Sequence, residues 1–101
     1  MGTASYLLKG TDKGEEISFA STAHGAGRVL SRAGARRRFQ AKDVVSQLKR
    51  KGIIVKAASG RIVEEESPDS YKDVHRVANV SHYLGIGKKV MISVPVAVAK
   101  G

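Results

Sequence analysis

The spacing of hydrophobic residues changes along the chain, and each spacing predicts a different element. A β-prone run at residues 3–8 (TASYLL) predicts a short strand. Charged residues and glycines follow (GTDKGEE) and indicate a loop, while residues 17–22 (ISFAST) suit a second strand or an irregular lead-in. The tetrapeptide HGAG predicts a further loop. Strands and loops are therefore expected in the first quarter of the chain.

Helical spacing dominates the middle of the chain. Residues 28–39 suit a helix, although Gly34 weakens it by roughly 1 kcal/mol relative to alanine. Residues 42–50 suit a second helix, with basic residues in the last turn and Gly52 beyond it. A third helix is predicted to begin at Ser67, with a proline at its first helical position. Its apolar face would consist of Tyr71, Val74, Val77, Ala78 and Leu84.

Two later segments predict strands. Residues 53–57 (IIVKA) suit a short buried strand, and residues 90–98 (VMISVPVAV) alternate strictly between faces, with Pro95 suited to a sheet edge or a bulge. The elements together predict a mixed fold, α/β or α+β, of short strands and about three helices. Because the strands are few and scattered, we expect several of them to belong to a sheet whose other members lie outside these residues.

Length and composition set the class of protein. A chain of 101 residues holds one small domain, or part of a larger one. Its 25 Leu, Ile, Val and Phe residues argue against wholesale disorder. The absence of cysteine excludes disulfides and thiolate metal sites. No apolar run approaches the roughly 18 residues of a membrane span, and no signal-peptide core is present, so we expect a soluble, cytoplasmic protein.

The positive charge is concentrated in one segment. The net charge is +9, which favours polyanionic partners such as RNA, DNA or nucleotides. From His24 to Lys51 the chain has nine Lys and Arg residues and a single acid, Asp43, whereas the remainder has nine basic and eight acidic residues. The basic segment, and not the whole surface, is thus the expected site of anion binding.

The basic segment begins with the stretch STAHGAGRVLSR. Glycines beside a polar residue let the backbone approach a ligand closely, and a loop that opens a helix directs free N–H groups at an anion. Arg28, Arg32 and Arg36 are spaced by four and would form a stripe along one face of the predicted helix. Three guanidinium groups in a row suit phosphates. The alternative is an ordinary solvated basic face.

His24 has chemistry that the other histidines lack. A neutral imidazole is a nucleophile toward phosphorus, and attack on a nucleotide α-phosphate would give a phosphoramidate if cations neutralise the departing pyrophosphate. His75 and His82 lie seven positions apart on the third predicted helix. A metal pair there is conceivable, but the spacing is not the usual four, and surface or packing roles have more weight.

The stretch STAHGAGRVLSR resembles the signature of the RtcB-type RNA-splicing ligases, in which the histidine of HGAGR carries GMP. The resemblance continues in order through MGTASYLLKG, KGIIVKAAS, EEESPDSYKDV and a final PVAVAKG. It covers the whole chain. The last motif departs mildly from the more usual PLGVVKG but keeps the terminal Lys-Gly.

The resemblance implies a ligase that depends on GTP and Mn²⁺. It would join RNA 3′-phosphate or 2′,3′-cyclic phosphate ends to 5′-hydroxyl ends, as in tRNA splicing and RNA repair. His24 would be the nucleophile that takes GMP from GTP, and Arg28 and Arg32 would hold RNA or phosphate. Contacts to the bound guanylate are implied for Ser5, His24, Gly25, Ala26, Gly27, Tyr71 and Lys100.

Within that set, Ser5 and Lys100 would contact the base, and Tyr71 would lie beside the guanine. Met1 and Gly2 match the end of another nucleotide-contacting loop. Taken without the resemblance, each residue has a plain interpretation: Ser5 as a loop-edge hydroxyl, Tyr71 as a packing residue, and Lys100 as a solvated side chain.

The family's metal ligands are a cysteine and histidines upstream of these motifs. We therefore expect residues 1–101 to form the C-terminal part of a single RtcB-type catalytic domain, with no metal ligand in this chain. The upstream ligase segment would be a partner that binds Mn²⁺, and the chain alone would be inactive. The alternatives are a small basic RNA-binding module without catalysis and a ribosome-associated structural protein; five motifs in order argue against the latter.

Overall fold

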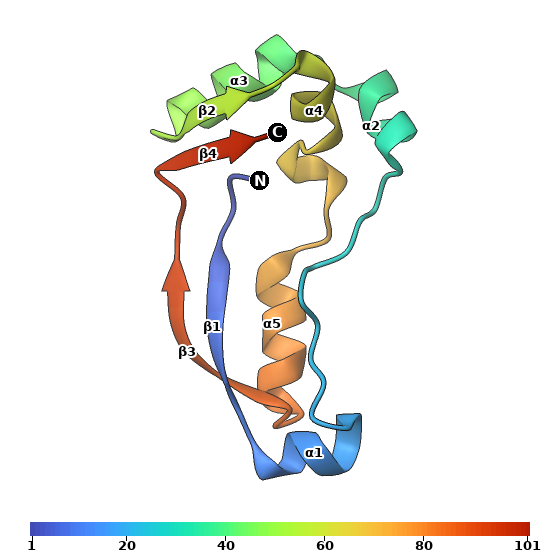
Figure 1. Cartoon of the computed structure of the whole chain (residues 1–101), viewed down its shortest axis with the longest axis vertical. Coiled ribbons are helices and arrows are strands. Elements are labelled where there is room, and N and C mark those ends of the chain that lie inside the picture. The colour runs from blue at the N-terminus through green and yellow to red at the C-terminus, as the bar shows by residue number, and fades with distance from the viewer. The chain divides into compact units, whose positions relative to one another are not determined.

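The computed structural model describes all 101 residues, which form two compact units. Unit 1 consists of Met1–Thr3, Arg28–Tyr71 and Val94–Gly101, and unit 2 of Ala4–Gly27 and Lys72–Ser93. Helices follow one another through most of the chain, with one strand at the start, one between α3 and α4, and two at the end (Figure 1). This confirms the predicted mixed α/β class. None of the helices combines the length and the hydrophobicity that crossing a bilayer requires.

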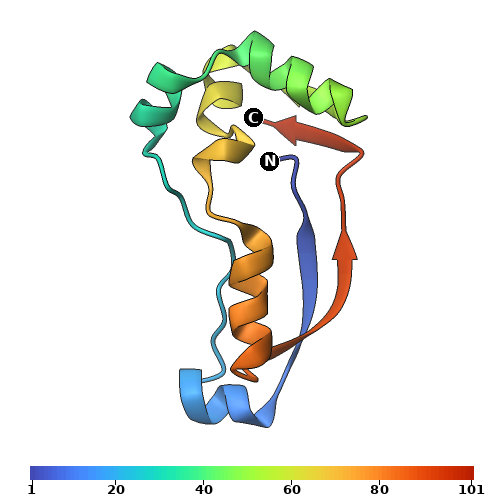
Figure 2. The same cartoon turned by 180° about the vertical axis from the view of Figure 1, so that it is seen from behind.

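Unit 2 is built on an antiparallel pair of strands. Strand β1 (Ser5–Gly10) pairs with β3 (Gly87–Ser93), and helix α5 (Val74–Tyr83) runs alongside them, as two opposite views show (Figures 1 and 2). Asp73 begins α5, because its carboxylate accepts a hydrogen bond from the backbone N–H of His75.

Helix α1 (Asp12–Ser18) replaces the charged loop expected after β1. The hydroxyl of Thr11 caps it by accepting a hydrogen bond from the Gly14 N–H, and acidic residues lie in the first turn. This position of the helix requires glycine, because a Cβ at Gly14 would come within 2.6 Å of the backbone oxygen of Ile86. This glycine marks a close approach of two segments, not a loop.

The strand alternative for residues 17–22 is wrong. Ile17 and Ser18 are the last residues of α1, and Phe19 and Ala20 take left-handed backbone angles, with φ of 53° and 58°. Two successive residues in that region reverse the chain and prevent an extended strand.

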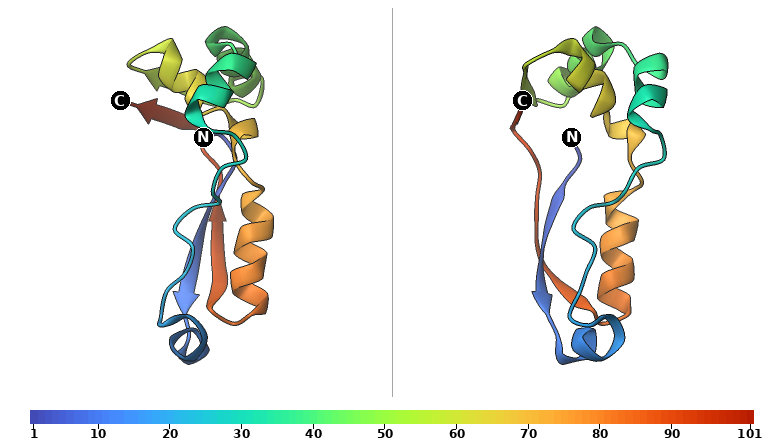
Figure 3. Two further views of the ribbon diagram at one scale, coloured as in Figure 1. Left: turned by 90° about the vertical axis from the view of Figure 1, so that its right-hand side faces the viewer. Right: turned by 45° about the vertical axis from the view of Figure 1, so that its right-hand side comes forward.

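Unit 1 packs helices on a parallel pair of strands. Strand β2 (Ile54–Ala57) pairs with β4 (Ala97–Lys100), and α3 (Ala41–Arg50) packs on β2 and on α4 (Gly60–Glu65), which also contacts α2 (Arg32–Arg38) (Figure 3). The buried core consists of Val44, Leu48, Ile53 and Val63.

One predicted helix start is wrong, and the other leads only to a short turn. The helix expected from Arg28 begins at Arg32, since the Ser31 hydroxyl caps the N-terminus through the Gly34 N–H. The helix expected from Ser67 is a single 3₁₀ turn, η1 (Pro68–Ser70), separate from α5, and the Ser67 side chain makes no capping bond.

The long alternating strand expected at residues 90–98 is two strands in two different sheets, β3 and β4, with Pro95 between them. Proline cannot donate to a sheet ladder, so the pairing ends there. The prediction of a buried strand at residues 53–57 is also wrong in part, because Ile53 is buried but Ile54 is 63% exposed. Each sheet has only two strands, which leaves hydrophobic side chains on its faces uncovered.

Candidate functional site

The HGAG stretch forms an exposed loop of unit 2. His24 is exposed and its side chain makes no hydrogen bond or ion pair within the chain. A Cβ added at Gly25 would meet no atom within 4 Å, so the packing of this chain does not itself require glycine there. The space over His24 and Gly25 is therefore free for a ligand that approaches the backbone.

Hydrogen bonds fix both ends of this loop. The hydroxyls of Thr22 and Ser81 lie 3.2 Å apart, and the backbone N–H of Lys72 donates to the Gly27 oxygen at 3.0 Å. Gly27 has a φ of +77°, a conformation that favours glycine. The loop does not open a helix as predicted, because α2 starts beyond Ser31, which already caps it.

Arg28 lies at the start of unit 1 and is held by several groups. Its Nη1 donates to the Tyr71 hydroxyl at 2.9 Å, Nε to the Leu30 oxygen at 2.9 Å, and Nη2 to the Glu65 backbone oxygen at 2.5 Å. The guanidinium carbon also lies 4.7 Å from the centre of the Tyr71 ring. An isolated β-bridge joins the backbones of Arg28 and Tyr71. The side chain is therefore fixed in one position.

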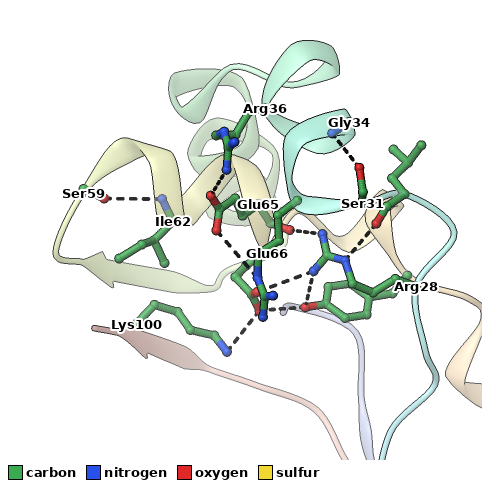
Figure 4. Close-up of polar contacts among 12 residues, drawn as sticks. Arg28, Ser31, Gly34, Arg36, Ser59, Ile62, Glu65, Glu66 and Lys100 are labelled. Atoms are coloured by element: carbon green, nitrogen blue, oxygen red, sulfur yellow. Dashed lines mark hydrogen bonds and ion pairs between the residues drawn. The ribbon is translucent and has the colours of Figure 1, made fainter.

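Glu66, the residue after α4, interacts through its carboxylate with three surrounding side chains (Figure 4). Its Oε2 accepts a hydrogen bond of 2.8 Å from the Tyr71 hydroxyl and lies 3.4 Å from Lys100 Nζ. Its Oε1 lies 3.6 Å from Arg28 Nη1. Lys100 is supplied by β4, whose parallel pairing with β2 brings the end of the chain to this carboxylate. Tyr71, Lys100 and Arg28 thus share one anionic partner.

The electrostatics of the pair Glu66 and Tyr71 follow from these contacts. Burial alone would raise the pKa of Glu66, but the hydrogen bond from Tyr71 and the charges of Lys100 and Arg28 together hold that pKa below its ordinary value. Burial and the hydrogen bond to Glu66 raise the pKa of Tyr71, against the opposing effect of Arg28. Near neutral pH, Glu66 is therefore an anion and Tyr71 a neutral donor.

Glu65 holds the other two arginines of the predicted stripe. Arg32 Nε lies 3.8 Å from Glu65 Oε2, and Arg36 forms an ion pair with Oε1 of the same carboxylate (Figure 4). The stripe itself is wrong, because Arg28 lies outside the helix. The three guanidinium groups converge instead on the acidic pair Glu65 and Glu66.

Neither acid was among the predicted site residues. Both belong to the motif EEESPDSYKDV, whose acidic run at residues 64–66 immediately precedes Ser67 and Pro68. Such a run is equally typical of a solvated helix end, and only the fold shows that cations from three distant segments surround it.

The residues that the resemblance implies for guanylate, and for RNA or phosphate, are divided between the units. Unit 1 brings together Arg28, Tyr71 and Lys100, with Arg32 on the neighbouring Glu65. The remaining implied residues belong to unit 2, where Ser5 lies on β1 opposite Ser93 of β3. They are Ser5, His24, Gly25, Ala26 and Gly27.

The other two histidines have structural partners. His75 Nδ1 lies 2.5 Å from the Tyr6 hydroxyl, and His82 Nδ1 accepts a hydrogen bond of 3.1 Å from the backbone N–H of Lys89. No group of three or more His, Asp or Glu side chains that could hold a metal ion occurs in the structure. Each of these two histidines thus forms a hydrogen bond within unit 2.

A comparison with models of protein families gives a match over residues 1–101, the whole chain, to the family described as tRNA-splicing ligase RtcB. The match includes the exposed HGAGR loop and the Glu66 cluster. The chain belongs to the RtcB family of tRNA-splicing RNA ligases.

Proposed function

We propose that residues 1–101 are the C-terminal part of an RtcB catalytic domain in which His24 takes GMP from GTP. Family membership supports this, and the observation that carries it is the geometry of the loop. His24 is exposed and without an internal partner, in a loop whose two ends are fixed by hydrogen bonds. A nucleophile needs this combination of access and restricted position.

The proposed step is a displacement at the α-phosphorus of GTP. An imidazole nitrogen of His24 attacks, an N–P bond forms, and the P–O bond to the β-phosphate breaks with departure of pyrophosphate. The charge of the leaving group must be neutralised by cations. The side chain of Arg32 is 69% exposed, and its guanidinium retains hydrogen-bonding capacity beyond Glu65, so we assign it to a phosphate of the nucleotide or RNA.

Mn²⁺ has no cluster of ligands among these residues. We therefore assign no step to it here, and propose that its ligands belong to an upstream segment of the ligase. For the same reason we expect the chain alone to be inactive.

The guanine contacts are proposed for Ser5, Tyr71 and Lys100. The ammonium group of Lys100 is bound to Glu66 on one side and the side chain is 37% exposed, so it can donate a second hydrogen bond to a base. Arg28 is tied to Glu65, Glu66 and Tyr71, and we assign it a clamping role beside the nucleotide. The complete enzyme would join RNA 3′-phosphate or 2′,3′-cyclic phosphate ends to 5′-hydroxyl ends.

The test is covalent labelling. The chain is incubated with Mn²⁺ and GTP labelled at the α-phosphate, with and without an upstream RtcB segment, then denatured and examined for label. We expect label only with the segment present, its loss in His24→Ala, and its retention in the matched control His75→Ala.

Other outcomes contradict parts of the proposal. Label on the chain without the upstream segment would overturn the expected dependence on that segment. Label that survives in His24→Ala would overturn the role of His24. No label in any mixture would favour the alternative, a small basic RNA-binding module without catalysis.

A further inference from the structure

The basic residues of the segment from Arg28 to Lys51 fall into two classes. Arg28, Arg32 and Arg36 form ion pairs with Glu65 and Glu66. The other six are exposed and form no ion pair; they are Arg37, Arg38, Lys42, Lys49, Arg50 and Lys51. The excess positive charge of the chain is thus left uncompensated on α2, α3 and the residue after α3.

Helix α3 presents three of these cations on one side. At 3.6 residues per turn, Lys42, Lys49 and Arg50 fall within an arc of about 100°. Val44 and Leu48, on the opposite side, are buried in the core of unit 1. Since the buried side fixes the helix, the outer face is a rigid platform for the three charges.

The spacing of the charges suits a nucleic-acid backbone. Lys42 and Arg50 are eight residues apart, which is about 12 Å along the helix axis. One strand of a duplex carries a phosphate every ~3.4 Å of its axis, so this length faces about three phosphates. Asp43 is the only acid of α2 and α3, and it forms no ion pair. It lies in the first turn, where the helix dipole favours an acid.

We propose that the outer face of α3, together with Lys51 at its end, is a docking surface for the RNA backbone. It would hold the body of the substrate through phosphates, independently of base sequence and apart from contacts at Arg28 and Arg32. This inference rests on the proposed function in one respect only, which is that the proposed function identifies the polyanion as RNA. Such a surface would position the RNA while the reacting end is free to enter the site.

The experiment measures RNA binding by fluorescence anisotropy of an end-labelled RNA across a range of salt concentrations. The triple variant Lys42→Gln, Lys49→Gln, Arg50→Gln is made in the intact protein. Its matched control removes three exposed cations of unit 2 that form no ion pair: Lys9→Gln, Arg76→Gln, Lys88→Gln. Circular dichroism confirms that both variants keep the wild-type helix content.

We expect the α3 variant to bind RNA at least tenfold more weakly at low salt. The dependence of log K on log salt should flatten by about two units, because each lost phosphate contact removes about 0.7 to 0.9. The control should stay within about twofold of the wild type. Equal loss in both variants would mean a nonspecific charge effect and would overturn the proposal.

Competition separates RNA from an acidic protein. Polyglutamate of matched charge should displace the RNA poorly; displacement as strong as that by unlabelled RNA would overturn the RNA assignment in favour of an acidic polypeptide. Guanylate labelling of His24 needs no RNA and is measured on the same variants. Normal labelling with unchanged RNA binding of the α3 variant would refute the docking surface alone. Absent labelling of the wild-type protein, with weakened RNA binding of the α3 variant, would refute the proposed catalytic role alone.

Discussion

The Tyr71 hydroxyl donates a hydrogen bond of 2.8 Å to the carboxylate of Glu66, five positions before it in the chain. The same carboxylate binds Lys100, almost thirty positions after Tyr71. Two residues proposed for guanine recognition therefore depend on one acid that does not itself belong to the proposed set of guanylate contacts. Glu66 is best described as a positioning residue for both.

Replacing Glu66 by glutamine should destabilise unit 1. The change removes the charge that holds Lys100 and Arg28, while the amide can still accept a hydrogen bond from Tyr71. We expect a loss of about 1.5–3 kcal/mol in the free energy of unfolding, the range for hydrogen bonds to charged groups. Urea denaturation of the intact protein measures it.

The matched control for that variant is Asp69→Asn, which makes the same chemical change at an exposed acid without an ion pair. It should stay within about 0.5 kcal/mol of the wild type, as most surface substitutions do. Equal stability of Glu66→Gln and Asp69→Asn would show that the Glu66 cluster contributes nothing to the fold.

Lowering the pH should reduce the contribution of Glu66 to the stability of the folded protein. Its pKa in the folded protein is below the ordinary 4.5, so the unfolded chain takes up the proton first as pH falls. The stabilisation is therefore fully present above pH 4.5 and is lost as pH falls toward the folded-state pKa. The difference in stability between wild type and Glu66→Gln should shrink over that window; a difference that grew with acid would contradict it.

Raising the pH should reduce the stabilisation that Tyr71 contributes, whereas at Glu66 it is lowering the pH that does so. Its pKa is raised above the ordinary 10.0, so the unfolded chain loses the phenolic proton first. The stabilisation is fully present below pH 10.0 and is lost as pH rises through the folded-state pKa. Tyr71→Phe should remove this alkaline decline, which denaturation measured at several pH values will show.

Alanine at Gly25 and at Gly27 should separate binding from folding. Gly27 has a φ of +77°, and alanine there should cost about 1–2 kcal/mol of stability. At Gly25 a Cβ meets open space, so stability should change little. If GMP lies against this loop, Gly25→Ala will still reduce labelling of His24. Labelling that equals wild type in a stable Gly25→Ala variant would argue against a close approach of the nucleotide there.

The chain of 101 residues on its own should have marginal stability. Its strands form two sheets of two strands each, and large hydrophobic residues such as Val94 and Val96 are exposed. Two-stranded sheets rarely persist without further cover. Thermal unfolding followed by circular dichroism should be broad and of low amplitude. A sharp cooperative transition above about 50 °C, in the range of ordinary domains, would contradict this prediction.

The amphipathic helix at residues 42–50 could be predicted because Val44 and Leu48 fit a period that packing then satisfies. Helix α1 could not, because Gly14 is determined by the nearby Ile86 backbone, a contact made by a segment about seventy positions away. Pro95 indicated a sheet edge or a bulge, but the uninterrupted alternation of residues 90–98 did not show that the run divides between two sheets there. Local pattern predicted elements, but tertiary contacts decided where they end.

In the candidate site, too, the local sequence predicted some features, whereas others depended on tertiary contacts. The motif around His24 carried the expectation of an exposed loop, which its sequence of glycines favours. The convergence of Arg28, Arg32 and Arg36 on Glu65 and Glu66 required knowledge of how α2 and α4 pack. Charge spacing left these arginines open to phosphate contact or to a solvated face. In the structure they form ion pairs, and the six other cations of the segment do not.

The parallel pairing of β2 with β4 also has a consequence for biosynthesis. Val55 is paired with Val98, and 43 positions separate the two. At translation rates of about 5–20 residues per second, β2 leaves the ribosome some seconds before its partner exists. A nascent chain stalled in this interval would expose one side of β2 and lack Val98 against the core. The pairing of β2 thus has to wait until β4 has been synthesised.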